Sequence, residues 1–255
     1  MSYSILTALD ESSWSTSAAD TSLWLNQHAE VRLTALNVVN VTQTRGGLIE
    51  DLAGLLGFEP VLVPQQVEAH FVGRGQNLLE DFEARCTREG VRCNTVLDQG
   101  GVVERICHHG RGHNLVIMGV RGETEQRFPG HGGGTMERVL RRTHSSTLVV
   151  PRGQSDIQGI TLGFDGSPGA RRALQSAADL ASRFHVPLHL VQVLEARGDE
   201  NALDGTRATL ESLDVPTSTI VVKGEPQEAL PAEAVRLGCN VLAMGYRGRS
   251  HLKNI

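Results

Sequence analysis

Two tandem α/β domains, each an open and doubly wound parallel sheet, are the fold that the sequence predicts. Apolar runs of five to seven residues alternate with helical patterns, which is typical of consecutive β-α-β units. Runs such as LVIMG are apolar without interruption, as expected of strands buried on both faces. The order strand, helix, strand, helix, strand then occurs a second time along the chain.

The repeat is carried by matched residues at a constant spacing. The run SILTALD near the start resembles GITLGFD in the second half, so that Asp10 matches Asp165 at an offset of 155 residues. Val38 matches Val193 at the same offset, so the first β-α-β unit recurs without a net gap. Further on, NLVIMGVRG matches NVLAMGYRG at an offset of 126, so the first copy holds 29 extra residues. We expect most of them between Gln43 and Gly75.

The elements of the first copy follow in chain order from these patterns. An apolar run ending in aspartate predicts the first strand, a helical pattern with Trp14 and Trp24 follows it, and VRLTALNVV predicts the second strand. The Gly-rich segment then precedes the helical pattern GTMERVLRRT and a last apolar run. The predicted strands are 4–9, 32–39, 92–97, 114–118 and 146–150, and the predicted helices are 14–29, 64–89, 101–111 and 134–143.

The polar stretch RGQSDIQG, residues 152–159, is the expected domain boundary. It gives a first, nucleotide-binding domain at 1–152 and a second domain at 159–255. The second copy has only RSHLKNI after Gly248, so we expect it, as given, to lack the last helix and strand of the first.

Composition and charge narrow the functional classes. The chain is 40% hydrophobic and 21% charged, as in globular proteins, and its net charge of −5 makes nucleic acid or an anionic membrane an unexpected partner. Four cysteines without a Cys-x-x-Cys pair suggest reduced thiols and a cytoplasmic location. The start lacks the pattern of a signal peptide, and no apolar window is long enough to predict a transmembrane helix.

Six glycines among residues 118–140 indicate a ligand site. In an open α/β sheet, ligands bind beyond the carboxyl ends of the strands, where Asp10, Val38 and the Met118-Gly119 pair are expected. Glycine allows backbone to approach a ligand closely, and a helix that begins at a Gly-rich segment presents free amides to an anion. Amides of Gly133, Gly134 and Thr135 would thus face phosphate, with the Asp10 carboxylate suited to a ribose or base.

Two common nucleotide motifs are absent. The chain has no G-x-x-x-x-G-K-[ST] loop. A dinucleotide fingerprint would follow the first strand, whereas these glycines follow the fourth. The pattern therefore indicates a mononucleotide site of a different kind.

With these residues the chain resembles tandem universal stress proteins, in particular the branch of that family that binds ATP. That branch has an aspartate after the first strand, here Asp10, and a G-x-x-G motif after the fourth, here Gly119 to Gly122. Its following Gly-Ser pair falls on Gly133 and Gly134 after ten intervening residues, just before the sequence ERVL. Gly134 replaces the hydroxyl residue of the pattern, so one phosphate contact must come from Thr135 or be lost.

The resemblance implies a Rossmann-like fold related to adenine-nucleotide hydrolases, and a stress-response protein that binds ATP, with Mg²⁺ accompanying the phosphates. It also implies a homodimer or an intramolecular pseudo-dimer of the two copies. Adenine would be held near the ends of the first two strands, ribose and α-phosphate near the fourth, and the outer phosphates at the following helix. The implied positions are Ala8, Leu9, Asp10, Val38, Met118, Gly119, Gly122, Gly133, Gly134 and Thr135.

Two other functional classes stay open. A slow ATPase could use Glu123, Glu125 or His131 to orient water, although no spacing singles one of them out as a general base. The chain could also be an interaction module that binds no nucleotide. The glycines would then form a loop, and Asp10 would serve only at the start of a helix. Cys107, His108, His109 and His113 are of metal-ligand type, but their spacing matches no common zinc site, and we expect a structural role.

Overall fold

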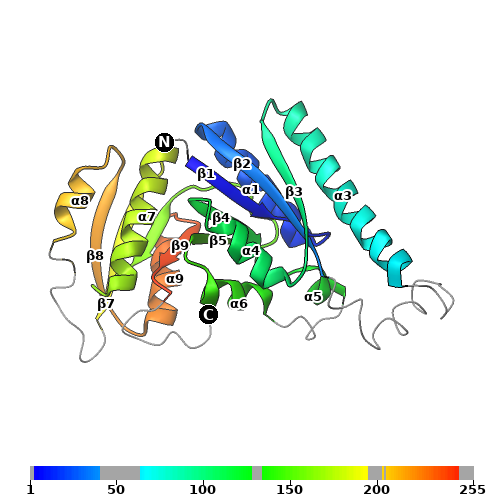
Figure 1. Ribbon diagram of the computed structural model, residues 1–255. Coiled ribbons are helices and arrows are strands. Elements are labelled where there is room, and N and C mark those ends of the chain that lie inside the picture. The colour runs from blue at the N-terminus through cyan, green and yellow to red at the C-terminus, as the bar shows by residue number, and fades with distance from the viewer. Residues whose placement is uncertain (1–2, 41–63, 128–133, 195–202, 204, 247–255) are drawn as a thin grey trace. The chain divides into compact units, whose positions relative to one another are not determined.

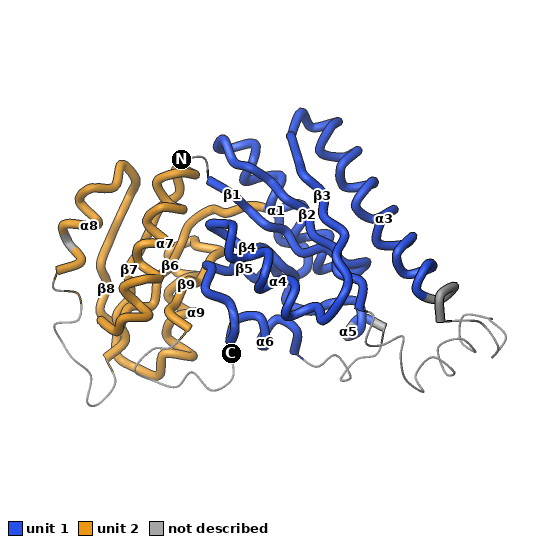
Figure 2. The backbone as a smooth tube through the Cα atoms, in the orientation of Figure 1, with its two compact units in different colours: residues 1–155 blue, residues 156–255 orange. Residues whose placement is uncertain are grey.

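The computed structural model describes residues 3–40, 64–127, 134–194, 203 and 205–246. The chain forms two compact units, residues 1–155 and 156–255, coloured separately in Figure 2. Each unit has its own parallel sheet, and each is described by itself below.

The described part of unit 1 has five strands: β1 (Tyr3–Ala8), β2 (Val31–Val39), β3 (Cys93–Gln99), β4 (Leu115–Gly119) and β5 (Ser146–Val150). Their order in the sheet is β3-β2-β1-β4-β5, and all four neighbouring pairs are parallel. The chain therefore winds outward from β1 in one direction and then crosses back to place β4 on its other side. This confirms the predicted open, doubly wound sheet.

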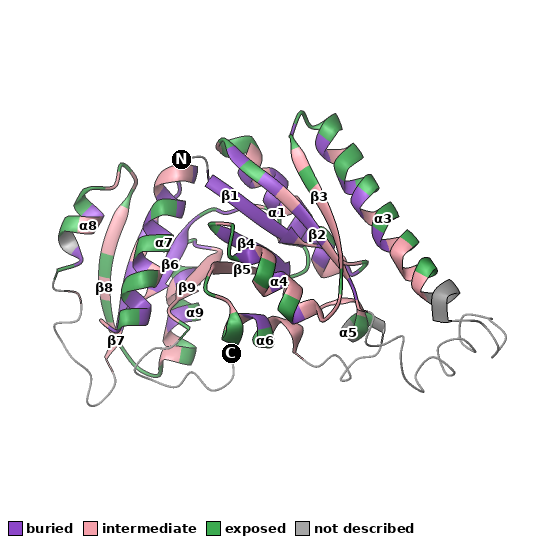
Figure 3. Cartoon of the chain, in the orientation of Figure 1, coloured by how far each residue is buried: buried purple, intermediate pink, exposed green. Residues whose placement is uncertain are grey.

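In the described residues, five helices accompany this sheet: α1 (Ser13–His28), α3 (Pro64–Arg88), α4 (Val102–Gly110), α5 (Glu123–Arg127) and α6 (Thr135–Arg142) (Figure 1). Leu6, Leu36 and Val116 pack with Val103 and Ile106 of α4 and Val139 of α6 in one buried cluster. Helix α1 packs on β1, β2, β4 and β5, and α3 packs on β2 and β3. Because helices cover the central strands, every residue of β1 and β4 except the last of each is buried (Figure 3).

The first helix of each unit begins with the same device. The Ser12 hydroxyl accepts a hydrogen bond of 3.1 Å from the Ser15 amide at the start of α1. Ser167 does the same for Ala170 at the start of the corresponding helix of unit 2, also at 3.1 Å. Such serine caps satisfy one of the free amides of a first helical turn.

Unit 2 repeats the first four strands of unit 1. Strands β6 (Ile160–Gly163), β7 (Leu188–Leu194), β8 (Thr217–Lys223) and β9 (Val241–Met244) lie in the parallel order β8-β7-β6-β9. Its helices are α7 (Pro168–Phe184), α8 (Arg207–Glu211) and α9 (Pro226–Arg236). Within the described residues, unit 2 thus has four strands where unit 1 has five.

Element bounds predicted for unit 1 agree with the structure to within two residues. The short helix α5 was not predicted, because five residues inside a Gly-rich segment carry no helical periodicity. Part of the extra length of the first copy lies in α3, which has 25 residues where α8 has five. Residues 43–63, where further extra residues were expected, lie outside the described part.

Candidate functional site

The carboxyl edge of the unit 1 sheet brings the predicted positions of three strands together. Ala8 ends β1, Val38 is the last residue but one of β2, and Met118 and Gly119 end β4. Strands β2 and β4 flank β1, so the switch in strand order lies between β1 and β4. A switch of this kind opens a crevice for ligands beyond the carboxyl ends of the strands.

Asp10 joins the two loops that leave this edge. Its Oδ1 accepts a hydrogen bond from the Ser12 amide at 2.9 Å, and its Oδ2 accepts one from the Glu123 amide at 2.8 Å. Its own amide donates to the Ser15 hydroxyl at 2.8 Å. Asp10 therefore does more than begin a helix: it links the β1–α1 loop to the start of α5, while Ser12 is the cap.

Leu9 is held between β1 and β2 by its backbone. Its amide donates to the Leu36 carbonyl, and its carbonyl accepts from Asn37 Nδ2, both at 2.8 Å. Asn37 was not predicted, although a polar residue inside the apolar run of a strand is a signal that could have found it. At Gly75 of α3, an added Cβ would lie 2.4 Å from Asn37 Oδ1, so this glycine lets α3 approach the site.

Gly119 and Gly122 are each required by contacts within the chain. A Cβ on Gly119 would lie 2.7 Å from Trp14 Cβ and 2.9 Å from the Trp14 carbonyl carbon. A Cβ on Gly122 would lie 2.9 Å from Asp10 Oδ2. Close packing of α1 and of Asp10 against the β4 end therefore already explains both glycines, independently of any ligand.

Two further contacts join helices and loops at the same edge of the sheet. The Ser13 amide donates to Gln126 Oε1 at 2.8 Å, which joins α1 to α5. Arg74 of α3 binds both Glu11, in the β1–α1 loop, and Glu123 of α5. These hydrogen bonds, that to Glu11 first, raise the pKa of the Arg74 guanidinium above its ordinary value. Arg74 lies in a helix with no motif around it, and Gln126 lies inside the Gly-rich segment at a position that the family pattern does not specify, so neither role was predicted from the sequence.

The start of α6 differs from the starts of α1 and α7. Gly134 is its N-cap in a left-handed conformation, with φ 30° and ψ 49°, and no described side chain caps this helix. Thr135 is its first residue, and the Arg138 amide bonds the Gly134 carbonyl at 2.9 Å. The first-turn amides of α6 therefore have no described side-chain cap, which leaves them available to an anion. Gly133 lies outside the described residues.

Unit 2 reproduces the first half of this arrangement. Asp165 Oδ1 accepts from the Ser167 amide at 3.0 Å, and the Phe164 amide donates to the Val191 carbonyl at 2.9 Å. A Cβ on Gly245, at the end of β9, would lie 2.4 Å from the Gly169 carbonyl carbon. The close approach of helix start to strand end is thus repeated, while Gly248 lies outside the described residues.

Other candidate groups have structural partners. His109 Nε2 lies 2.8 Å from Asp98 Oδ2, and this hydrogen bond lowers the pKa of the Asp98 carboxyl. In the described part of the chain, no three His, Cys, Asp or Glu residues gather as a metal site would require. Among the residues weighed for orienting water, the Glu123 carboxylate pairs with Arg74, whereas the Glu125 side chain and His131 lie outside the described residues.

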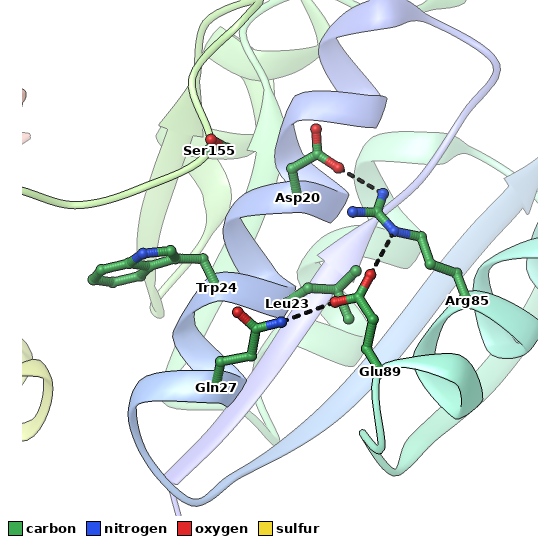
Figure 4. Close-up of a pocket in the computed structure, with 7 residues that line it drawn as sticks. All are labelled: Asp20, Leu23, Trp24, Gln27, Arg85, Glu89 and Ser155. Carbon is green, nitrogen blue, oxygen red and sulfur yellow. Dashed lines mark hydrogen bonds and ion pairs between the residues drawn. The ribbon is translucent and has the colours of Figure 1, made fainter.

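A cavity of about 320 Å³ lies elsewhere on unit 1 (Figure 4). Arg85 crosses it, 2.5 Å from Asp20 of α1 and 3.1 Å from Glu89. Most of its residues come from the later turns of α1 and the end of α3, with Ser155 from the segment after β5. These helices run back toward the amino ends of the strands, so the cavity is separate from the carboxyl edge. The lining residues are Asp20, Leu23, Trp24, Gln27, Arg85, Glu89 and Ser155.

A search of the described helices for a segment able to cross a membrane finds none. The sequence profile of the universal stress protein family matches residues 1–151 and 157–215. Universal stress protein Slr1230 of Synechocystis is 28% identical over 145 residues, which is 56% of this chain and 50% of that protein. The chain therefore spans about half the length of this curated relative.

Among solved structures, a universal stress protein from Archaeoglobus fulgidus matches with a TM-score of 0.74 at 17% identity, over 97% of this chain and 86% of that one. An Arabidopsis thaliana family protein with AMP bound matches with a TM-score of 0.38 at 14% identity, over 59% of this chain and 92% of that one. The second likeness is too slight to carry the ligand across, while the first shows the shared fold. Because the family profile matches most of the chain in two consecutive stretches, the chain belongs to the universal stress protein family, with two family domains in tandem.

Proposed function

We propose that unit 1 binds ATP at the carboxyl edge of β1, β2 and β4. Ala8, Leu9, Asp10 and Val38 would contact adenine and ribose. Met118, Gly119 and Gly122 would border the ribose and α-phosphate. Amides of Gly133, Gly134 and Thr135 would bind the outer phosphates, with Mg²⁺ held by the phosphates themselves.

The observation that carries the proposal is the start of α6, which follows β4 across the switch from Asp10. Helices α1 and α7 have serine caps, whereas α4, α6, α8 and α9 have no described side-chain cap. What distinguishes α6 is its left-handed glycine N-cap and its place after β4. First-turn amides without a side-chain partner, together with the helix dipole, favour an anion. A triphosphate supplies such an anion, and the Thr135 hydroxyl could donate one further hydrogen bond.

The protein would act as a nucleotide-dependent regulator in stress adaptation without strong catalysis. ATP would favour one arrangement of the loops at the carboxyl edge and thereby change the surface offered to partners. We also propose a cytoplasmic location, since all four cysteines are free thiols. The homodimer or pseudo-dimer implied by the family stays a prediction, to be checked by sedimentation of the whole chain.

Slow ATP hydrolysis is the second candidate, and its support is the same site. The Glu123 carboxylate is engaged by Arg74, which weakens it as a base for water. An interaction module without nucleotide is the third candidate, because contacts within the chain already explain Gly119 and Gly122. Phosphate release under single-turnover conditions separates the first of these from pure binding.

The test is nucleotide content followed by calorimetric titration of ATP with Mg²⁺ into the whole chain. Gly134→Val should weaken ATP binding at least about tenfold, because a side chain and a forbidden φ disturb the first amides of α6. Gly153→Val is the matched control: Gly153 also has a left-handed φ, of 83°, with open space around it, and lies after β5. It should keep wild-type affinity.

Three outcomes would count against the proposal. No binding of ATP, ADP or AMP by the wild-type chain would leave the interaction module. Equal loss of affinity in both glycine variants would indicate general strain instead of a phosphate site. Stoichiometric phosphate release would replace the regulator by the ATPase.

A further inference from the structure

We propose that Arg74 allows the carboxyl-edge site to bind a polyanion. It would do so by neutralising the charges of Glu11 and Glu123 and by holding the β1–α1 loop against the start of α5. The inference rests on the proposed nucleotide site and names the residue that makes its affinity depend on ligand charge. Nothing in the sequence pattern of the site includes Arg74, which lies in the middle of α3.

Arg74 is bound on two sides at the edge of the site. Its Nε and Nη2 both contact the Glu11 carboxylate, with 2.6 Å between Nε and Oε1. Its Nη2 also lies 2.8 Å from Glu123 Oε1, and its guanidinium lies 5.7 Å from the centre of the Phe71 ring. Only 21% of the Arg74 side chain is exposed, so the guanidinium is fixed and partly shielded from water.

The position of Arg74 is set by the neighbouring residue. Gly75 brings α3 so close to β2 and β3 that a Cβ there would lie 2.4 Å from Asn37 Oδ1 and 2.8 Å from Leu97 Cδ1. Asn37 in turn bonds the Leu9 carbonyl at 2.8 Å. Arg74 is thus positioned at the edge of the site by the packing of α3 on the sheet, through Gly75 and Asn37.

Charge explains why a cation is needed at this point. Asp10, Glu11 and Glu123 place three carboxylates around the turn that ends at Gly122, where the ribose and α-phosphate of the proposed ligand would lie. Arg121 of the same turn is an exposed cation, whereas Arg74 contacts two of the carboxylates directly. Without Arg74 these carboxylates would repel phosphate more strongly, and the repulsion would grow with each phosphate group. Arg74 offsets two of them and also ties the β1–α1 loop to α5, beside the Asp10 to Glu123 hydrogen bond.

The experiment compares adenosine, AMP, ADP and ATP on the whole chain by calorimetry. In Arg74→Gln we expect the dissociation constant of ATP to rise about tenfold, those of AMP and ADP by less, and that of adenosine by less than about twofold. Arg74→Lys should recover part of the loss, since lysine keeps the charge without the two-sided contact. The triple variant R74Q, E11Q, E123Q should recover ATP binding, because it removes the repelling carboxylates together with the arginine.

Arg85→Gln is the matched control. Arg85 lies on the same helix and also bridges two carboxylates, those of Asp20 and Glu89, but away from the carboxyl edge (Figure 4). It should lose comparable stability while leaving the ratio of ATP to adenosine affinity unchanged.

The outcomes separate the two levels of the proposal. If wild type binds ATP but Arg74→Gln weakens all four ligands by one factor, or none, Arg74 has only a structural role and the inference is wrong. The inference is equally wrong if the triple variant binds ATP no better than Arg74→Gln. If wild type binds none of the four ligands, the proposed function fails and the inference fails with it.

Discussion

Gly119→Ala tests how tightly α1 packs against the end of β4. The added Cβ would lie 2.7 Å from Trp14 Cβ and 2.9 Å from the Trp14 carbonyl carbon. Carbon atoms pack at about 3.5–4.0 Å, so β4 and α1 would have to separate by roughly 0.8 Å. Neither neighbouring atom is the end of a flexible side chain, and neither can turn away. Overpacking of this kind costs about 1–3 kcal/mol, and we expect unit 1 to lose that much stability.

The assay is urea unfolding followed by tryptophan fluorescence. Both tryptophans of the chain, Trp14 and Trp24, lie in unit 1, so the signal reports this unit even if unit 2 unfolds separately. Gly73→Ala is the control, because Gly73 lies within α3 with nothing within 4 Å of an added Cβ. Alanine there should stabilise unit 1 by about 0.4–1 kcal/mol.

The two alanine variants must move in opposite directions for the reasoning to stand. A Gly119→Ala protein as stable as wild type, within about 0.5 kcal/mol, would refute it. It would mean that the β4 end and α1 can separate without loss, and that Gly119 is needed for something other than packing. A ligand that approaches its backbone would then be the leading explanation.

Three further predictions follow from individual contacts. Gly245→Ala should destabilise unit 2 by about 1–3 kcal/mol, seen by far-UV circular dichroism, while the tryptophan transition stays where it was. Ser12→Ala should cost unit 1 about 1 kcal/mol through loss of the α1 cap, and an unchanged urea midpoint would disprove it. The hydrogen bond from His109 lowers the pKa of Asp98, so the pair should stabilise unit 1 above about pH 4 and lose that effect as the pH falls further. Asp98→Asn should therefore lower stability at about pH 6 by less than about 1 kcal/mol, the pair being partly exposed, and make no difference near about pH 2; a constant difference would contradict this.

The elements and the repeat were predictable from the sequence because they depend on local patterns. Apolar runs such as LVIMG and helical patterns such as that of α7 are determined by neighbours within a few turns. Asp10 and Gly119 could be placed at the same edge from the sequence, because parallel strands end together. The packing contacts that require Gly119 and Gly122 could not be predicted, since their partners, Trp14 and Asp10, are more than 100 residues away.

The sequence alone was enough to predict two parallel α/β units in tandem. It also predicted that Asp10 and the glycines of the family pattern lie at the carboxyl edge of the sheet. Only the tertiary structure decided which residues hold that edge together. Arg74, Asn37 and Gln126 stand at positions that the family pattern does not specify. They meet the loops of the site through contacts across 28 to 113 residues of chain. The packing of α3 on β2 and of α1 on β4 selects such contacts, and a local pattern cannot encode them because their partners are brought together only when the whole sheet has formed.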